Sequence, residues 1–294
     1  MIKVSVIIPN YNHAKYLKQR IDSVLNQTYK NIEVIILDDF SKDNSRDIIN
    51  GYAKNSVIKH IIYNKENSGS VYKQWFKGIS MANGDYIWIA ESDDWAEPDF
   101  LEKVLHGINS NPNVGIGFSD SYWVNDQGKR GDDLSIHHSS FFKTGKEEIK
   151  EHLIKYNTIQ NASAVLIRTD LAKRYMANIL NYKSCGDWCL YLDILYESNL
   201  IFIGSKLNNF RWYHDSVSSS ANSQGLWINE GLRIVAFSKA ASLSYQKGEL
   251  SVLLNYWLAK ANQFESFQKL NLQLKTFFYF CVFKSRILLN TFHK

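Results

Sequence analysis

Cysteine, proline and long apolar segments are scarce in this chain of 294 residues. The three prolines are too few for a collagen-like or proline-rich linker protein. The three cysteines, Cys185, Cys189 and Cys281, are too few for a disulfide framework, so a reducing cytoplasm is the expected compartment. The longest strongly apolar run, residues 277–283, is far shorter than the ~20 residues of a membrane-spanning helix. Residues 1–8 lack the pattern of a signal peptide, which predicts a cytoplasmic protein that is soluble or peripheral to a membrane.

The net charge of +5 is concentrated at the C-terminal end of the chain. Five of the 34 basic residues and none of the 29 acidic residues fall in 266–294, so the rest of the chain is neutral. This distribution argues against a nucleic-acid-binding protein, which would carry Lys and Arg across one face. The same segment is rich in Phe and Leu, so we expect it to contact the inner face of the cell membrane, or else to pack on the catalytic domain or on a second copy of the chain.

Short apolar runs alternate with helical patterns over the first 125 residues. The runs are rich in β-branched residues and lack polar alternation, which is typical of strands that are covered on both faces. They lie at residues 4–8, 32–37, 60–63, 86–90 and 114–118. We therefore expect an α/β fold with a mostly parallel central sheet flanked by helices. After residue 220 the pattern becomes helical, which predicts a first domain over 1–220 and a C-terminal helical region over 221–294.

Carboxylates follow the second and fourth apolar runs. Asp38 and Asp39 end the second run, and Glu91, Asp93 and Asp94 follow the fourth. In a parallel sheet these positions meet at one edge, where ligands bind. Clustered carboxylates repel one another unless a cation is present, so the sequence predicts an Mg²⁺ or Mn²⁺ site. For Asp38 and Asp39 alone, loop capping is an equally good interpretation. Neither a dinucleotide-binding glycine motif nor a P-loop is present.

Four motifs together resemble glycosyltransferase family 2. They read VSVIIPNYN, IILDDFSKD, GISMANGDYIWIAESDDW and CGDW, in the order and spacing that is usual for the family. The resemblance covers residues 3–215 and implies a GT-A fold, a nucleotide-sugar donor, a divalent metal and inversion at the anomeric carbon. It also implies that residues 1–125 form the nucleotide-sugar-binding half and residues 126–220 the acceptor-binding half.

The resemblance implies roles for five residues of the first half. Pro9 and Tyr11 would contact the nucleobase, with the Tyr11 ring stacked on it. Asp39 would accept a hydrogen bond from the base, which suits the N–H of uracil or thymine. Asp93 would contact the ribose, and Asp94 would face the metal bound to the diphosphate. Glu91 stands where many members of the family have Asp.

The segment after Gly69 departs from the commonest family pattern, because many members have Ala-Arg-Asn where this chain has Tyr72-Lys73-Gln74-Trp75. Lys73 is expected near the pyrophosphate in place of that arginine, or else on a solvated helix face. Asp187 matches the general base, and Trp188 beside it is expected to stack on the acceptor sugar. His214 is expected to bind the metal or the diphosphate, although an ordinary surface histidine is an alternative.

These observations predict an inverting, metal-dependent transferase. It would move a sugar from a UDP- or dTDP-linked donor to a glycan or lipid-linked acceptor in the synthesis of a surface polysaccharide. Two alternatives are a nucleotidyltransferase and a non-catalytic glycan-binding module. The first would need a glycine-rich loop after residue 8, and the second would be expected to lose Asp94 or Asp187, which are both present.

Overall fold

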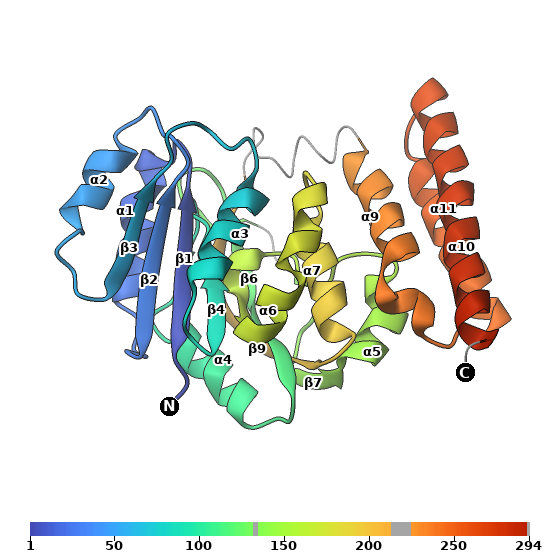
Figure 1. The fold of residues 1–294 in the computed structure, drawn as a ribbon, viewed down its shortest axis with the longest axis horizontal. Coiled ribbons are helices and arrows are strands. Elements are labelled where there is room, and N and C mark those ends of the chain that lie inside the picture. The colour runs from blue at the N-terminus through green and yellow to red at the C-terminus, as the bar shows by residue number, and fades with distance from the viewer. Residues whose placement is uncertain (132–134, 213–224, 293–294) are drawn as a thin grey trace.

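The structure, a computed structural model, describes residues 1–131, 135–212 and 225–292 (Figure 1). The N-terminal part alternates strands with helices, as the apolar runs predict. It consists of β1 (Val4–Asn10), α1 (Ala14–Leu25), β2 (Ile32–Asp38), α2 (Ser45–Gly51), β3 (Ile58–Tyr63), α3 (Val71–Met81), β4 (Tyr86–Ile89), β5 (Trp95–Ala96), α4 (Phe100–Asn109) and β6 (Val114–Val124).

Shorter elements dominate the middle of the chain, and three longer helices follow. The middle consists of β7 (Phe141–Thr144), α5 (Gly145–Glu148), a π-helical turn (Ile149–Leu153), a 3₁₀ turn (Ala162–Ala164), β8 (Val165–Arg168), α6 (Thr169–Tyr175), a second 3₁₀ turn (Met176–Asn181), α7 (Gly186–Leu195) and β9 (Asn199–Arg211). The C-terminal part consists of α9 (Leu226–Phe237), a 3₁₀ turn (Lys239–Ser242), α10 (Lys247–Ala261) and α11 (Ser266–Phe292).

The strands form one central sheet in the order β3-β2-β1-β4-β8-β6-β9-β5, with β7 also paired to β9. The parallel pairs are β3 with β2, β2 with β1, β1 with β4, and β6 with β9. The strands β8, β5 and β7 pair in the antiparallel sense. The predicted α/β class with flanking helices is therefore confirmed, but the parallel arrangement is limited mainly to the first half. An apolar run does not encode the direction in which a strand pairs, because that depends on distant partners.

Helices cover both faces of the sheet, which explains the absence of polar alternation in its strands. Successive residues of a strand point to opposite faces. Ile7 and Ile35 belong to the core under α3, α6 and α7, whereas Val6 and Val34 belong to the core under α1 and α4. Two layers of helices thus enclose the sheet and leave its carboxyl edge, at the top of Figure 1, for the polar residues.

The three C-terminal helices lie beside α7, at the end of the molecule far from β3 (Figure 1). Trp188 of α7 stacks on Trp257 of α10 with ring centroids 6.1 Å apart. A Cβ atom at Gly231 of α9 would lie 2.5 Å from the Trp188 ring, so only glycine permits this approach. The predicted boundary near residue 220 falls outside the described residues. Among the described helices, none has the length and apolar character to cross a membrane.

Candidate active site

The carboxyl ends of β1 and β2 bring two polar turns together. Asn10 is in register with Asp38, and its side-chain amide donates to that carboxylate over 3.0 Å. The turns that follow contain Asn12 and Phe40, both with positive φ, which allows the backbone to reverse directly above the sheet. Tyr11 is 46 % exposed at this edge, so its ring is open to a ligand, while Pro9 is buried within β1.

Asp39 organises the loop before α3. It is 4 % exposed, and its carboxylate accepts hydrogen bonds from the side-chain amides of Asn64 (2.6 Å) and Gln74 (2.9 Å). The Ser68 backbone N–H and hydroxyl also donate to it, over 2.9 and 2.7 Å. A carboxylate has about four acceptor positions, so these donors already occupy Asp39. A nucleobase N–H at Asp39 would therefore displace one of these donors.

Gly69 and Lys73 lie at the same loop. Gly69 has φ of +72°, a left-handed conformation that favours glycine. Lys73 is exposed, and its ammonium donates to the Ser68 carbonyl oxygen over 2.9 Å. The lysine is thus held over the loop by one neutral contact, which leaves its charge available to an anion at this edge.

Two buried arginines hold the acidic turn that follows β4. Arg20 of α1 is fully buried, and its Nε donates to the Glu91 carbonyl oxygen over 2.8 Å. Arg211 at the end of β9 donates from Nε to the Asp93 carbonyl oxygen over 2.7 Å. The Arg211 backbone N–H donates to Asp94 Oδ1 over 2.8 Å. Residues of α1 and β9, far apart in the sequence, therefore hold the turn that contains Asp93 and Asp94.

Glu91 and Asp94 of this turn have perturbed pKa values. Burial, together with the charge of Asp93, raises the pKa of Glu91 to about 8 and the pKa of Asp94 to about 7. The Arg20 guanidinium opposes both shifts, but burial lowers its own pKa to about 10. Trp75 Nε1 donates to Glu91 Oε1 over 2.7 Å and holds that side chain against α3. Burial and the charge of Asp93 thus disfavour ionisation of Glu91 and Asp94, and a bound cation would favour it.

The donor set fits a hard divalent cation that shares its coordination with a substrate. Mg²⁺ typically binds one or two protein carboxylates together with substrate phosphates and water. Asp93 and Asp94 supply such a pair. Within the described ranges, no three His, Cys, Asp or Glu side chains lie close enough to hold a metal by themselves. The predicted ligand His214 lies outside the described residues.

Asp187 is in the first turn of α7. It is partly exposed and accepts a hydrogen bond from the Asn157 side-chain amide over 3.1 Å. Burial raises the pKa of Asp187 to about 6, although hydrogen bonds from backbone N–H groups at the start of the helix lower it. A Cβ atom at Gly186 would lie 2.8 Å from the Tyr72 ring, so the glycine lets α7 approach α3 here. Asp187 is thus a carboxylate with a pKa near neutrality.

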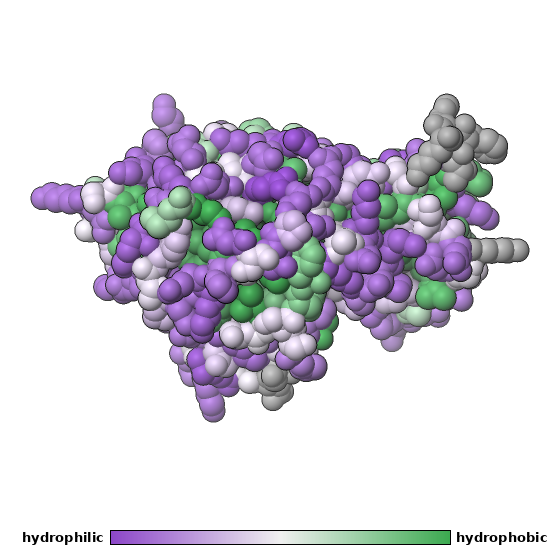
Figure 2. Space-filling view, turned by 90° about the horizontal axis from the view of Figure 1, so that it is seen from below, coloured by the Kyte–Doolittle hydropathy of each residue, from purple (hydrophilic) through white to green (hydrophobic). Residues whose placement is uncertain are grey.

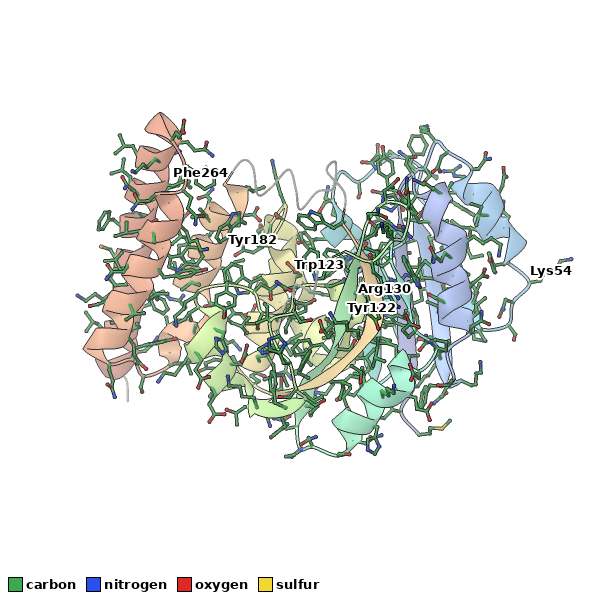
Figure 3. The ribbon with its side chains drawn as sticks, turned by 180° about the vertical axis from the view of Figure 1, so that it is seen from behind. Lys54, Tyr122, Trp123, Arg130, Tyr182 and Phe264 are labelled. Carbon is green, nitrogen blue, oxygen red and sulfur yellow. The ribbon has the colours of Figure 1, made fainter. Side chains whose placement is uncertain are left out.

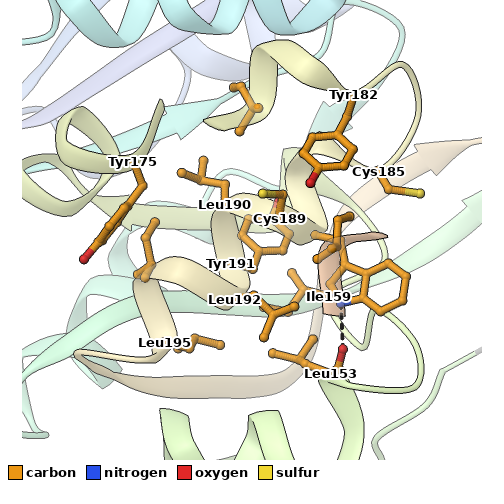
Figure 4. Packing of buried hydrophobic residues seen from close by; sticks show 14 of the residues in the cluster. Leu153, Ile159, Tyr175, Tyr182, Cys185, Cys189, Leu190, Tyr191, Leu192 and Leu195 are labelled. Carbon is orange, nitrogen blue, oxygen red and sulfur yellow. Dashed lines mark hydrogen bonds between the residues drawn. The ribbon is translucent and has the colours of Figure 1, made fainter. Parts of the chain in front are cut away.

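Trp188 lies in the hydrophobic core. It is 3 % exposed, and its Nε1 donates to the Leu153 carbonyl oxygen over 2.9 Å, the bond drawn in Figure 4. Trp257 stacks on its ring. Trp188 therefore has no exposed ring face on which an acceptor sugar could stack, contrary to the expectation from the sequence. The motif locates the residue but does not show that its side chain packs against Trp257 in the core.

A half-buried aromatic cluster lies elsewhere on the second half of the sheet. It comprises Trp123, near the end of β6 and labelled in Figure 3, together with Phe210 and Trp212. The Trp123 ring centroid is 4.8 Å from that of Phe210 and 5.4 Å from that of Trp212. Trp123 and Phe210 line a small hollow, which residues 158–161 also line. Asn157, the partner of Asp187, directly precedes these residues.

Sequence reasoning did not identify Arg20 as a site residue. The sequence pattern could have indicated that Arg20 is buried, because it shares the apolar face of a helix with Leu17, Ile21 and Val24. A charged residue on the apolar face of a helix needs a buried partner. Gln74 and Trp75 gave no comparable signal, since their roles depend on contacts with strands far away in sequence.

The comparisons with known proteins agree with this geometry. The chain is 28 % identical over 222 residues to glycosyltransferase GlyG of Streptococcus pneumoniae, covering 71 % of this chain and 70 % of the relative. It is 29 % identical over 228 residues to an uncharacterised glycosyltransferase of Haemophilus influenzae, covering 76 % and 85 %.

Two solved structures have the same fold. Staphylococcus aureus TarS in complex with UDP-GlcNAc superimposes with a TM-score of 0.69 at 15 % identity, covering 98 % of this chain and 89 % of that one. The mannosyltransferase PcManGT of Pyrobaculum calidifontis, in complex with GDP-Man and Mn²⁺, gives 0.59 at 14 % identity, covering 98 % and 87 %.

The sequence model of glycosyl transferase family 2 matches residues 5–172, more than half of the chain. That range contains the strand ends and acidic turn described above. The protein is therefore a glycosyltransferase and belongs to glycosyl transferase family 2.

Proposed function

We propose that this glycosyltransferase inverts the anomeric configuration of a UDP- or dTDP-linked sugar as it transfers the sugar to a hydroxyl group of a glycan or lipid-linked acceptor. The observation that carries the proposal is that two carboxylate sites both adjoin α3. Trp75 of α3 binds Glu91 in the turn that contains Asp93 and the buried Asp94. Tyr72 of α3 lies beside Asp187, which has a pKa of about 6. The assignment of the product to surface polysaccharide synthesis is part of the proposal.

In this proposal, Asp187 is the general base. It takes the proton of the acceptor hydroxyl as that oxygen bonds to the anomeric carbon, while the bond to the diphosphate breaks. Attack on the face opposite the diphosphate inverts the anomeric centre. Asn157 holds the Asp187 carboxylate through one oxygen, which leaves acceptor capacity for the incoming hydroxyl. A pKa of about 6 lets Asp187 be ionised at neutral pH and still take up a proton.

Asp93 and Asp94 would hold Mg²⁺ or Mn²⁺ together with the diphosphate. When bound, such a cation supplies Lewis-acid stabilisation of the leaving diphosphate. Arg20 and Arg211 keep the turn in position by binding its backbone carbonyls. Lys73 would add a charge near the diphosphate, and His214 would be a further ligand. PcManGT, a protein of the same fold, is described in complex with GDP-Man and Mn²⁺, which supports a divalent cation here.

Tyr11, Asp39 and Gly69 would bind the nucleoside part of the donor. The exposed Tyr11 ring suits stacking on a base. Asp39 suits a base N–H if one donor from the loop around Gly69 moves aside. Pro9 would support this surface from within β1. The complex of TarS with UDP-GlcNAc favours a uridine donor over a guanosine donor for this chain.

A panel of nucleotide sugars tests the proposal directly. We expect slow hydrolysis of one UDP- or dTDP-sugar in the presence of Mn²⁺, and little hydrolysis of GDP-sugars. The measurement is release of free nucleotide, with and without EDTA. Hydrolysis of no nucleotide sugar, together with no detectable binding of UDP by calorimetry, would contradict the proposal.

The hollow beside Trp123 is the proposed acceptor subsite. Trp123 and Phe210 offer apolar ring faces, Asp120 and Asn161 line the same hollow with polar groups, and such mixed linings suit sugars. We expect Trp123→Ala to raise the KM for the acceptor about tenfold or more while donor hydrolysis stays unchanged, because the stacking face is lost. An unchanged KM for the acceptor would contradict the proposal that the acceptor binds in this hollow. Trp227→Ala, in α9 away from the hollow, serves as the control.

A further inference from the structure

The helix α11 presents a long apolar face to solvent. Leu270, Leu274, Phe277 and Cys281 are spaced alternately by four and three residues, so they form one stripe along the helix. Leu270, Leu274 and Phe277 are 54 %, 61 % and 49 % exposed, and Cys281 is exposed. Phe278 beside the stripe is 60 % exposed. An isolated exposed apolar residue is ordinary, but a continuous stripe of this kind marks an interaction site.

The opposite face of α11 already anchors the helix to the protein. Leu272, Thr276, Phe283 and Ile287 are buried against the neighbouring helices. Arg286 donates to the carbonyl oxygens of Ala236 and Ser238 at the end of α9, over 2.7 and 3.0 Å. The exposed stripe is therefore not needed to hold the helix in place. Figure 2 shows apolar side chains at the surface of this end of the molecule, which α10 and α11 form.

The charge of the segment distinguishes between two occupants of this face. Residues 266–294 contain no acid. Lys284 continues the three- and four-residue spacing of the stripe and is exposed, and Lys269 and Lys275 are partly exposed on the same helix. In the described part of the chain, none of these three lysines forms an ion pair.

A symmetric dimer through this face is disfavoured. In a two-fold interface the same patch meets itself, so Lys284 would face a surface that offers no acid. Lys284 would lose its water without gaining an acid from the partner helix. At a membrane surface, in contrast, a lysine keeps its ammonium among the headgroups while its aliphatic stem lies against the apolar region. Anionic headgroups would also compensate the charge.

We propose that the face of α11 formed by Leu270, Leu274, Phe277, Phe278 and Cys281 binds the surface of an anionic phospholipid bilayer. The helix would lie in the interface plane, with its apolar stripe in the acyl boundary and its lysines among the headgroups. This proposal is independent of the reaction, because it uses no residue of the active site. It would hold the enzyme where a lipid-linked acceptor is found.

Cys281 allows a direct test with the full chain. Cys185 and Cys189 are buried, so a polarity-sensitive fluorophore on a thiol reports chiefly on Cys281, inside the stripe. We expect a blue shift and quenching by brominated acyl chains on vesicles of phosphatidylcholine with about one third phosphatidylglycerol. Pure phosphatidylcholine vesicles should give a weak response. Salt at about 1 M, where the Debye length is about 3 Å, should release most of the protein.

Matched variants separate the stripe from general surface effects. Leu274→Gln with Phe277→Gln should weaken sedimentation with the anionic vesicles about tenfold or more, because the inserted apolar surface is lost. Val252→Gln with Leu180→Gln removes residues of similar exposure, 58 % and 40 %, outside α11 and should change little. Circular dichroism checks that both variants fold.

Two outcomes would overturn the proposal. One is a protein that ignores anionic vesicles at low salt. The other is a salt-resistant dimer in sedimentation velocity that Leu274→Gln with Phe277→Gln converts to monomer, since the face would then bind a second copy. Donor hydrolysis measured on the same samples shows separately whether the proposed reaction occurs.

Discussion

Asp187→Asn should lower the rate of sugar transfer by about 10²–10⁴-fold while the affinity for nucleotide stays the same. The asparagine keeps the size of the side chain and its contact with Asn157, but it cannot take the proton of the acceptor hydroxyl. The measurement is single-turnover transfer beside calorimetric binding of UDP in the presence of Mn²⁺. Asp170→Asn is the matched control, because Asp170 is also in the first turn of a helix but is exposed and paired with Arg168.

The pH dependence follows from the same residue. The base must be ionised, and burial raises the pKa of Asp187 to about 6. Transfer by the parental enzyme should therefore rise with pH up to about 6 and level off above it, because the carboxylate is protonated on the acid side. The residual rate of the asparagine variant should not show this rise between acidic pH and about pH 6. Transfer at the parental rate by Asp187→Asn would assign the base to another carboxylate.

Asp94→Asn should lower transfer by about 10²-fold or more and weaken Mn²⁺ binding. Asp94 is 2 % exposed, and the asparagine can still accept the hydrogen bond from the Arg211 backbone N–H, so the fold should persist. What is lost is the negative charge that would hold the cation. Electron paramagnetic resonance of free Mn²⁺ measures binding without reference to activity. Asp99→Asn, a surface change at the start of α4, is the control.

The stability of the metal-free protein supplies an independent check. The pKa values of Asp94 and Glu91 are raised to about 7 and 8, so between about pH 4 and 8 the folded state binds more protons than the unfolded state. Unfolding free energy contributed by this turn should therefore decrease as pH rises through that range. Mn²⁺ with UDP should restore stability most at pH 8.

Full transfer by Asp94→Asn in EDTA would contradict the metal-dependent proposal.

The exposed apolar stripe of α11 shows where sequence patterns reach their limit. Residues 277–283 are apolar on every side of a helix, so the sequence only slightly favours membrane contact over packing on the catalytic domain or on a second copy of the chain. The structure divides them, with Phe283 in the core and Phe277 and Phe278 at the surface. Only the packing of α11 on α9 and α10 selects the buried face, because several faces of the helix are apolar enough to be buried.

Asp39 and Trp188 show the same limit within the candidate site. The sequence locates Asp39 at the end of an apolar run, but its saturation by donors from Asn64, Ser68 and Gln74 depends on a loop that folds back over the strand. The motif places Trp188 beside the general base, yet its ring turns into the core against Trp257. Neighbours in sequence can point to opposite surroundings, because successive side chains on a helix are about 100° apart.

The sequence by itself determined the α/β class, the strands of the first half and the edge at which Tyr11, Asp39 and Asp94 lie. It could do so because apolar runs record burial on both faces, and polar residues directly after them must lie at the ends of strands. Only the tertiary structure decided that β8 pairs with β4 in the antiparallel sense, that Arg20 and Arg211 bind the backbone of the acidic turn, and which face of α11 is exposed. Each of these depends on contacts between residues distant in the chain, and no local pattern of hydropathy or charge encodes such contacts.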